Sequence, residues 1–363
     1  MNKEKQILNH IRMNPFISQQ ELSSKVGLSR PAVANYIANL TKRGEIKGRG
    51  YILREESAIM CIGGANTDRK ARTNQEVRLY SSNPVKITEV CGGVARNFAE
   101  NLSRLGCSTA LMTCVGDDKE GEWILRETKS QGVDISQVWV LPTERTGTFI
   151  TLLDINGESI VSMADMNIYE KLTISMFEEK WSYIVASKAV FLDTNIPEDC
   201  INYLIKRCKD ENIPIYIDTV SSAKARKLPL QLDGVELLIA NCQEAEALAE
   251  IKIESIKDCQ FACEKIKQRG VQKVIITMGD QGVYYFSTEE SGHLPPFKTD
   301  IIDVTGAGDA FAACTIYGIM NEQSLFNTCQ LGLAGAVLTL QTEESISSIL
   351  KPEKLHEIVE EFS

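Results

Sequence analysis

The runs "KAVFLDTN" (residues 188–195) and "IPIYIDTV" (213–220) decide the fold. Each is of strand length and rich in Val and Ile, and most runs of this kind are followed by 10 to 18 residues of helical pattern. This alternation is typical of βαβ units around a mostly parallel sheet that is buried on both faces. Functional residues should directly follow the runs, because the active sites of such sheets lie at the carboxyl ends of the strands. The other runs are "SAIMCIGG" (57–64), "STALMTCVG" (108–116), "VELLIANC" (235–242) and "VQKVIITMG" (271–279).

One section of the chain departs from this pattern. The stretch "TGTFITLLDINGESIVSMADMN" (146–167) alternates on both sides of Asn156-Gly157, which is the strongest short-range signal for a two-residue hairpin. Together with the extended segment "NPVKITEV" (83–90), it predicts a small separate sheet with strands at about 80–92 and 145–166. Near the substrate end of an α/β body such a sheet would form a lid, and an ordinary edge hairpin is the alternative.

Charge divides the chain into two parts. Residues 1–54 carry a net charge of +7 and residues 55–363 a net charge of −17. Only the first part suits a polyanionic partner. We therefore expect two domains, 1–54 and 55–363.

The basic part has the pattern of three short helices followed by two short strands. The second helix opens with a capping box of Ser18 and Glu21, and the third opens with Ser29 as N-cap and Pro31 in its first turn. The segment "GEIKGRGYILRE" (44–55) follows as two strands around a basic tip. This order resembles the winged helix-turn-helix of bacterial regulators, whose third helix enters the major groove of double-stranded DNA while the wing touches phosphates. The resemblance implies base contacts from Ser29, Arg30 and Asn35, and phosphate contacts from Lys42, Arg43, Lys47 and Arg49. A small helical cap with a solvated basic face is the alternative.

The acidic part contains a candidate phosphate site in "DVTGAGDAFAACTIYGIM" (303–320). Apolar residues at helical spacing follow the glycines, so "GAGD" is predicted at a helix N-terminus, where unpaired amides and the helix dipole attract an anion. Asp309 lies beside these amides, where it could accept the proton of an acceptor hydroxyl during phosphoryl transfer. Taken alone, this motif could also be a simple helix cap.

Cysteine usage and hydropathy bound the location of the protein. The eleven cysteines are scattered, odd in number and without a CxxC pair, which argues against a disulfide framework or a thiolate metal site. The N-terminus lacks the apolar core of a signal peptide, and no stretch approaches the ~20 apolar residues of a membrane helix. We expect a cytoplasmic protein with no membrane partner.

Two further glycine motifs complete a recognisable set. "CIGGANTD" (61–68) and "VCGGVARNFAENLSRLG" (90–106), with "DVTGAGD", closely resemble the ribokinase, or phosphofructokinase-B, family of carbohydrate kinases from residue 57 to about 345. The resemblance implies a ribokinase-like α/β fold with a small β lid, and ATP and Mg²⁺ as cosubstrate and cofactor. It implies that Asp309 is the catalytic base, with Gly306, Ala307 and Gly308 as its anion hole. It further implies sugar contacts from Asn66, Asp68, Gly92, Gly93 and Asn97, nucleotide contacts from Asn241, Thr277, Gly279 and Gly282, a water-mediated Mg²⁺ contact from Glu244, and a monovalent-cation (K⁺) site beside Asp303 and Thr305.

Other segments narrow the substrate. "SNPVKI" (82–87), "GGVARN" (92–97), "ADMNI" (164–168), "DTNI" (193–196) and "DTVS" (218–221) resemble those of bacterial pseudouridine kinases. This likeness implies phosphorylation of the 5′-hydroxyl of pseudouridine, with Asp165 and Asn167 addressing the base, while Arg96 receives no role. Another nucleoside or ribose kinase, and a regulator whose kinase-derived body only senses ligand, remain alternatives. A homodimer is expected if the DNA target is palindromic.

Overall fold

The computed structural model describes residues 3–14, 17–46 and 58–362. These residues form two compact units, one comprising residues up to 58 together with 175–188, the other comprising 59–174 together with 189–363. The predicted wing strands, with Lys47 and Arg49, lie outside the described residues.

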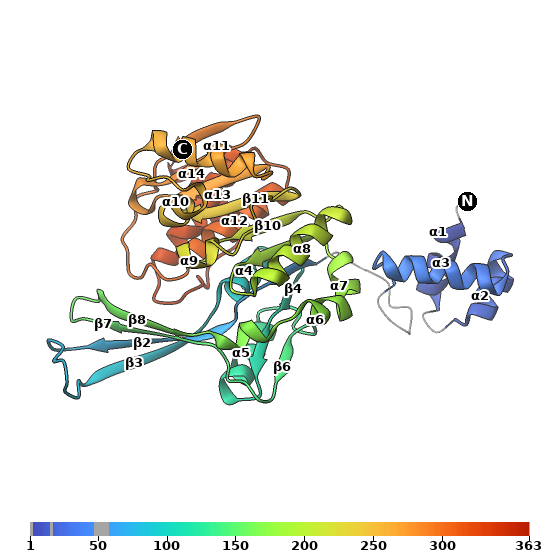
Figure 1. The fold of residues 1–363 in the computed structure, drawn as a ribbon, viewed down its shortest axis with the longest axis horizontal. Coiled ribbons are helices and arrows are strands. Elements are labelled where there is room, and N and C mark those ends of the chain that lie inside the picture. Colours follow the sequence, from blue (N-terminus) through green and yellow to red (C-terminus); the bar gives the residue numbers. More distant parts are fainter. Residues whose placement is uncertain (1–2, 15–16, 47–57, 363) are drawn as a thin grey trace. The chain divides into compact units, whose positions relative to one another are not determined.

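An eight-stranded sheet is the framework of the larger unit (Figure 1). Its order is β14-β13-β12-β11-β10-β9-β1-β4, with parallel pairing from β12 to β4 and antiparallel pairing of β13 and β14 at one edge. All six apolar runs named above form strands of this sheet, so the predicted α/β fold is confirmed. The bounds are β1 Ile59–Ile62, β4 Thr109–Met112, β9 Ala189–Asp193, β10 Ile215–Asp218, β11 Val235–Asn241, β12 Lys273–Thr277, β13 Val283–Phe286 and β14 Ser291–Leu294.

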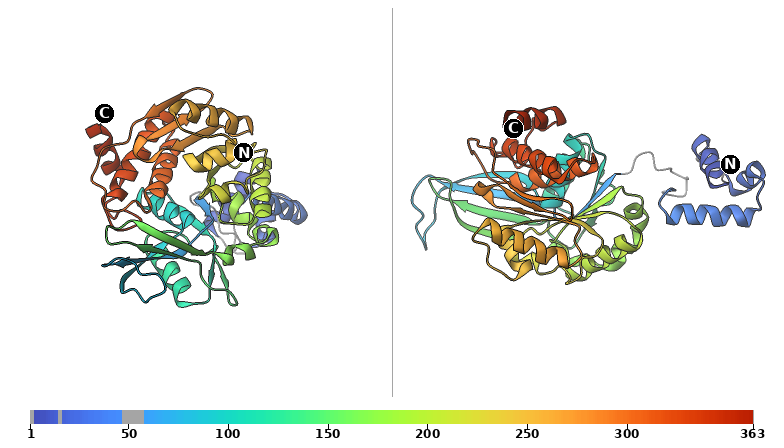
Figure 2. Two further views of the ribbon diagram at one scale, coloured as in Figure 1. Left: turned by 60° about the vertical axis from the view of Figure 1, so that its left-hand side comes forward. Right: turned by 90° about the horizontal axis from the view of Figure 1, so that it is seen from above.

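Helices cover both faces of this sheet, as the parallel pairing requires. The right-hand view of Figure 2 shows the red helices near the C-terminus on one face and the yellow-green to yellow-orange helices of residues 198–268 on the other. Phe98 of α4 stacks on Phe191 of β9 with ring centroids 3.6 Å apart, inside one continuous apolar core. The larger helices are α4 Val94–Arg104, α5 Lys119–Ser130, α8 Glu198–Asp210, α10 Cys242–Ala249, α11 Ile256–Gln268, α12 Ala307–Met320, α13 Leu325–Leu340 and α14 Pro352–Phe362. The remaining elements of this unit are the strands β5 Cys114–Gly116 and β6 Trp139–Leu141, the short helix α9 Ser222–Ala225, and the 3₁₀ turns η1 Asn167–Lys171 and η2 Gly279–Gln281. The short helices α6 Ile174–Glu179 and α7 Trp181–Val185 fall in the segment 175–188 that belongs to the smaller unit, apart from Ile174.

A second sheet of four strands confirms the predicted small sheet (Figures 1 and 2). Its order is β3-β2-β7-β8, with β2 Asn66–Thr73, β3 Val85–Gly92, β7 Thr148–Leu153 and β8 Ser159–Asp165. Strand β2 was not predicted, although it is central and carries Asn66 and Asp68.

The hairpin between β7 and β8 differs from the two-residue turn that was expected. Asp154 N donates to Glu158 O at 2.8 Å, and the Asp154 carboxylate accepts from the amides of Asn156 and Glu158, each at 2.8 Å. Three residues are therefore enclosed, with Gly157 at a φ of 88°. The hairpin therefore has a three-residue loop, residues 155–157, in which the glycine adopts the left-handed conformation. The carboxylate of Asp154, the residue directly before the loop, stabilises this loop through its hydrogen bonds to the amides of Asn156 and Glu158.

The smaller unit has the three predicted helices, α1 Lys3–Met13, α2 Gln19–Val26 and α3 Arg30–Lys42. The capping box of Ser18 and Glu21 is present, Gly27 ends α2 with a φ of 64°, and Ser29 caps α3. Nine apolar side chains from the helices and the segments beside them make a separate core.

Two further expectations can be compared with the structure. Within the described residues, no helix has the length and apolar character needed to cross a bilayer. All eleven cysteines are free thiols.

Candidate active site

The "GAGD" motif lies at the N-terminus of α12, as predicted. Gly306 is the N-cap with a φ of 81°, and a Cβ on it would lie 2.0 Å from Ser345 O, so only glycine fits. The Ala307 amide donates to Val304 O at 3.3 Å, in the turn that leads into the helix. Gly306 and Ala307 are half-buried and Gly308 is exposed, so the loop is accessible to a ligand. A loop of this kind offers main-chain donors and the positive end of a helix dipole to an anion.

Asp309, in the first turn of α12, faces an amide from α4. Asn97 Nδ2 donates to Asp309 Oδ2 at 2.8 Å, which joins two motifs that are 212 residues apart in the chain. Burial raises the pKa of Asp309 to about 7, with Asp68 and Asp193 adding to the rise and the Asn97 hydrogen bond opposing it. A carboxyl group with this pKa can exchange a proton near neutral pH.

Asp68 and the paired glycines form the neighbouring part of the site. Asn66 Nδ2 donates to Asp68 Oδ1 at 2.6 Å, and a Cβ on Gly92 would lie 2.2 Å from Asp68 Oδ2. Gly93 has a φ of 100°, and a Cβ on it would lie 2.5 Å from Ala65 Cα. Burial raises the pKa of Asp68 to about 6, against the lowering effects of Asn66 and Lys70. The structure therefore brings all five predicted sugar-binding residues to one place beside Asp309.

Asp193, at the end of β9, is a residue for which sequence reasoning assigned no role. Its carboxylate is fully buried and accepts from the amides of Gly64 at 2.7 Å, Ala95 at 2.9 Å and Asn195 at 2.8 Å. Burial raises its pKa, although the amides of Gly64 and Asn195 oppose the rise. Through these hydrogen bonds Asp193 connects the segments that follow β1 and β9 to the start of α4, and so stabilises the backbone of the site. Its place at the end of an apolar run was the available signal.

The predicted nucleotide residues lie at the ends of two adjacent strands. Asn241 of β11 and Thr277 of β12 are register partners, and Gly279 and Gly282 follow β12 with φ values of 60° and 87°. A Cβ on Gly282 would lie 2.0 Å from Leu294 O, so this turn also requires glycine.

Glu244 is engaged by protein donors. It forms a capping box with Asn241, and its Oε2 also accepts from Thr219 Oγ1 at 2.7 Å. Among the described residues, no cluster of three or more His, Cys, Asp or Glu side chains could hold a metal ion. Burial raises the pKa of Asp218, and the negative charges of Glu244 and Asp309 add to the rise. Asp218, Glu244 and Asp309 thus bring several carboxyl groups near one another without forming a complete set of metal ligands. Such an arrangement fits a Mg²⁺ ion that keeps most of its waters and is held mainly by phosphates.

The Asp303 carboxylate, predicted to border a monovalent-cation site, already has partners within the protein. It forms an ion pair with Lys70 of β2, and its Oδ1 accepts from the Thr305 amide at 2.8 Å. Burial would raise the pKa of Asp303, but Lys70 and Thr305 outweigh that effect and lower it. A cation at this carboxylate would have to displace the Lys70 ammonium.

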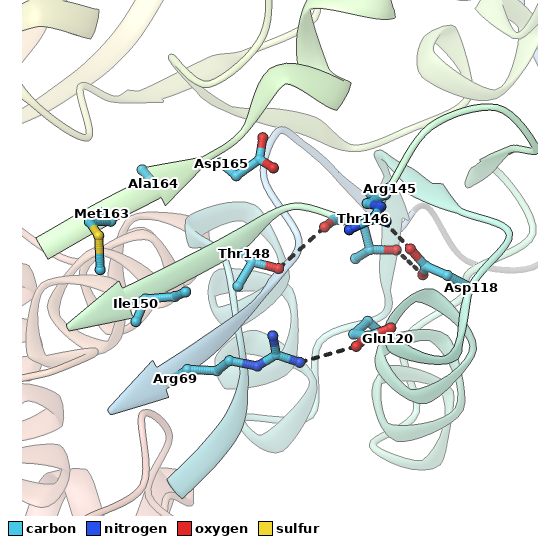
Figure 3. Close-up of a pocket in the computed structure, with 10 residues that line it drawn as sticks. All are labelled: Arg69, Asp118, Glu120, Arg145, Thr146, Thr148, Ile150, Met163, Ala164 and Asp165. Atoms are coloured by element: carbon cyan, nitrogen blue, oxygen red, sulfur yellow. Dashed lines mark hydrogen bonds and ion pairs between the residues drawn. The ribbon is translucent and has the colours of Figure 1, made fainter. Parts of the chain in front are cut away.

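Asp165 and Asn167 are not brought together with Asp68. Register pairs Thr67 with Thr148 and Thr148 with Asp165, so these side chains share the face of the small sheet opposite to Asp68. Asp165 is exposed and accepts from Asn167 Nδ2 at 3.2 Å. It borders a cavity of about 560 Å³ together with Arg69 and Glu120, which form an ion pair (Figure 3). The predicted base contact of Asp165 and Asn167 receives no support from this arrangement.

Five of the residues predicted to contact DNA lie in or directly beside α3, whereas Lys47 and Arg49 fall outside the described residues. Arg30, Asn35 and Lys42 are exposed. The Ser29 hydroxyl caps the helix by accepting from Ala32 N at 3.3 Å, and Arg43 pairs with Glu4 at 3.0 Å and Glu45 at 3.1 Å. Arg30, Asn35 and Lys42 are thus available to a ligand, whereas Ser29 and Arg43 already have partners within the unit.

The fold and the site together define a carbohydrate kinase with an attached helix-turn-helix unit. Residues 56–352 match the pfkB family of carbohydrate kinases, and the chain belongs to this ATP-dependent family. Residues 2–47 match a winged helix-turn-helix DNA-binding family.

Individual relatives agree with this assignment. The chain is 34% identical to a pseudouridine kinase of Escherichia coli over 75% of its length and 88% of that protein. It is 30% identical to the uncharacterized sugar kinase YeiI of Escherichia coli over 93% of each chain. A solved carbohydrate kinase from Agrobacterium tumefaciens superposes with a TM-score of 0.74 at 27% identity, covering 84% of this chain and 97% of that one.

Proposed function

We propose that this protein transfers the γ-phosphoryl group of ATP to the 5′-hydroxyl of a nucleoside, and that the nucleoside is pseudouridine. The observation that carries the proposal is the Asn97–Asp309 hydrogen bond at 2.8 Å, which joins the acceptor residues to a carboxylate with a pKa of about 7. The identity of 34% to a pseudouridine kinase supports pseudouridine as the acceptor.

The residues of the site divide the reaction between them. Asp68 accepts hydrogen bonds from sugar hydroxyls, and Asn66 and Asn97 can both donate and accept. The acceptor oxygen forms a bond to the γ-phosphorus as the bond to the bridging oxygen of ADP breaks, and Asp309 receives the hydroxyl proton. Because this transition state is loose, positioning and charge dispersal over the amides of residues 306–308 carry most of the barrier reduction.

The nucleotide lies, in this proposal, beside Asn241, Thr277, Gly279 and Gly282. Mg²⁺ would be held by the phosphates and, through water, by Glu244, and when bound it neutralises phosphate charge. Glu244 keeps its hydrogen bonds to Asn241 and Thr219 in this arrangement, so its contact runs through water.

A panel of acceptors tests the substrate. Purified protein with Mg-ATP should phosphorylate pseudouridine in preference to uridine, inosine and ribose. Equal turnover of ribose would favour a sugar kinase with a broader range of acceptors, an alternative that the 30% identity to the sugar kinase YeiI supports. No turnover with any acceptor would favour a ligand-sensing regulator.

Asp309→Asn tests the base. We expect turnover to fall by about 10²–10⁴-fold while acceptor binding persists, because the amide keeps the shape but cannot take a proton. Asp210→Asn, at the exposed end of α8, is the matched control and should keep wild-type turnover. Full activity in Asp309→Asn would refute the proposed mechanism.

We propose that the N-terminal unit binds double-stranded DNA, as its helix-turn-helix match and net charge of +7 support. Binding should weaken steeply with salt, and Arg30→Ala and Lys47→Ala should each weaken it further. A two-fold dimer on a palindromic site is the expected assembly. Binding that is absent, or that does not change with salt, would refute this role.

A further inference from the structure

Arg96 is a buried cation directly beside the proposed acceptor residues. Its side chain lies on α4 and is 5% exposed, and it forms an ion pair with Glu100, which is 3% exposed. Arg96 Nη1 also donates to Cys91 O at 3.1 Å, and Nε donates to Thr128 Oγ1 at 3.3 Å. A buried charge with this many partners holds one fixed position.

One further bond of Arg96 determines the orientation of Asn97. Arg96 Nη1 donates to Asn97 Oδ1 at 3.1 Å. Because a guanidinium has only donors, the amide oxygen of Asn97 must face Arg96, and the amide nitrogen must face the other way. That nitrogen donates to Asp309 Oδ2 at 2.8 Å, and the ionised form of Asp309, which is the form that acts as a base, can only accept. The order of donors and acceptors from Arg96 to Asp309 is therefore fixed by chemistry at both ends.

We propose that Arg96 is a positioning residue for phosphoryl transfer, which orients the Asn97 amide so that its nitrogen holds the Asp309 carboxylate beside the acceptor hydroxyl. The proposal rests on the kinase function proposed above. Arg96 itself acts only through Asn97 and through its charge.

The charges around Asp309 give this arrangement a measurable consequence. Burial is the largest cause that raises the pKa of Asp309, and the negative charges of Asp68 and Asp193 add to it. The carboxyl group of Asp218 also lies near enough for Asp309 to raise the pKa of Asp218. Arg96 is the positive group that opposes the negative charges around Asp309. Loss of Arg96 removes both this charge and the constraint on the Asn97 amide, and both changes raise the pKa of Asp309.

Arg104 provides a matched control. Arg104 Nη2 lies 2.8 Å from Glu100 Oε1, so Glu100 is shared by two guanidinium groups. Arg96→Met and Arg104→Met each remove one of these groups from Glu100, but only Arg96→Met removes the bond to Asn97. Each variant leaves Glu100 with one remaining partner.

The first measurement is the pH dependence of kcat/KM. Its acidic limb should lie near pH 7 in the wild type and in Arg104→Met, and about one unit higher in Arg96→Met, which lowers kcat/KM at pH 6 about tenfold. The limb position does not depend on the fraction of enzyme that is folded, so partial misfolding cannot imitate the shift. Arg96→Lys keeps the positive charge but lacks the planar guanidinium with its several donors. Its acidic limb should therefore lie between those of the wild type and Arg96→Met.

The second measurement needs no turnover. The ¹³Cγ resonance of Asp309, assigned by its absence in Asp309→Asn, should titrate near pH 7 in the wild type and in Arg104→Met and at higher pH in Arg96→Met. An unchanged titration in Arg96→Met, or an equal shift in Arg104→Met, would overturn the role of Arg96. Absence of kinase activity in the wild type would instead overturn the proposed function and leave this titration to decide the role of Arg96.

Discussion

Replacing Gly306 with alanine places a methyl group where the structure has no room for one. The added Cβ would lie 2.0 Å from Ser345 O and 2.8 Å from Ser345 C, both of them main-chain atoms, and the residue would keep a φ of 81°. The left-handed conformation costs a non-glycine residue about 1–2 kcal/mol, and overpacking costs a further ~1–3 kcal/mol. We expect Gly306→Ala to lower the free energy of unfolding by about 2–5 kcal/mol.

Two other glycines separate the contributions to this loss. Gly106 has a φ of 82° with nothing within 4 Å of an added Cβ, so Gly106→Ala should show the backbone cost alone, about 1–2 kcal/mol. Gly308, in the first turn of α12, also has open space around an added Cβ and no left-handed φ. Gly308→Ala should therefore stabilise the fold by about 0.5–1 kcal/mol.

Activity should not follow stability in this series. The methyl group of Gly308→Ala lies in the exposed part of the loop, where the phosphoryl group must approach the amides, and a displacement of about 1 Å can cost about 100-fold in rate. Denaturant unfolding and kcat/KM measured on the three variants check these expectations. Wild-type stability in Gly306→Ala would refute the packing argument, and wild-type activity in Gly308→Ala would refute the anion-binding role of the loop.

Three further predictions concern charged residues. The pKa of Asp309 is about 7 in the folded protein and ~3.9 in an unfolded chain, so the stability that its protonated form contributes is lost as the pH rises through 7. At pH 8, Asp309→Asn should therefore be more stable than the wild type by about 1–2 kcal/mol, a figure that is reduced for the solvent around this half-buried group. Near pH 4 the two proteins should be equally stable, and unfolding curves measured at both pH values test the prediction. Asp193→Asn should lower the free energy of unfolding by about 3 kcal/mol, as measured with denaturant. The reason is that the asparagine side chain has only one oxygen, so at least one of the buried backbone N–H groups that Asp193 binds loses its acceptor. A loss below about 1 kcal/mol would contradict this prediction. The rate should be the same in potassium, sodium and choline chloride, because Lys70 already neutralises Asp303, and a clear dependence on potassium would show that the ammonium is displaced.

The features that were predicted correctly are encoded locally. Six of the eight strands of the large sheet follow from the short apolar runs, whereas β13 and β14 were not predicted. The ends of α2 and α3 follow from Ser18, Glu21, Gly27 and Ser29, whose side chains and backbones act within a few residues. The start of α12 follows in the same way from the "GAGD" motif.

The features that were missed depend on residues distant in the chain. Strand β2 has the sequence "NTDRKART", which lacks apolar alternation, and it is a strand because it pairs with β3 on one side and β7 on the other. Asp193 acquires its role from amides at positions 64 and 95. The side of the sheet that Asp165 occupies is set by register, which composition does not reveal.

The distance in sequence between Asn97 and Asp309 also bears on when the enzyme can first work during its synthesis. The 212 residues that separate them take roughly 10–40 s to translate at ~5–20 residues per second. Throughout that interval a nascent chain has Asn97 but lacks the Asp309 carboxylate to which its amide is hydrogen-bonded. The proposed phosphoryl transfer can thus begin only after Asp309 has been translated.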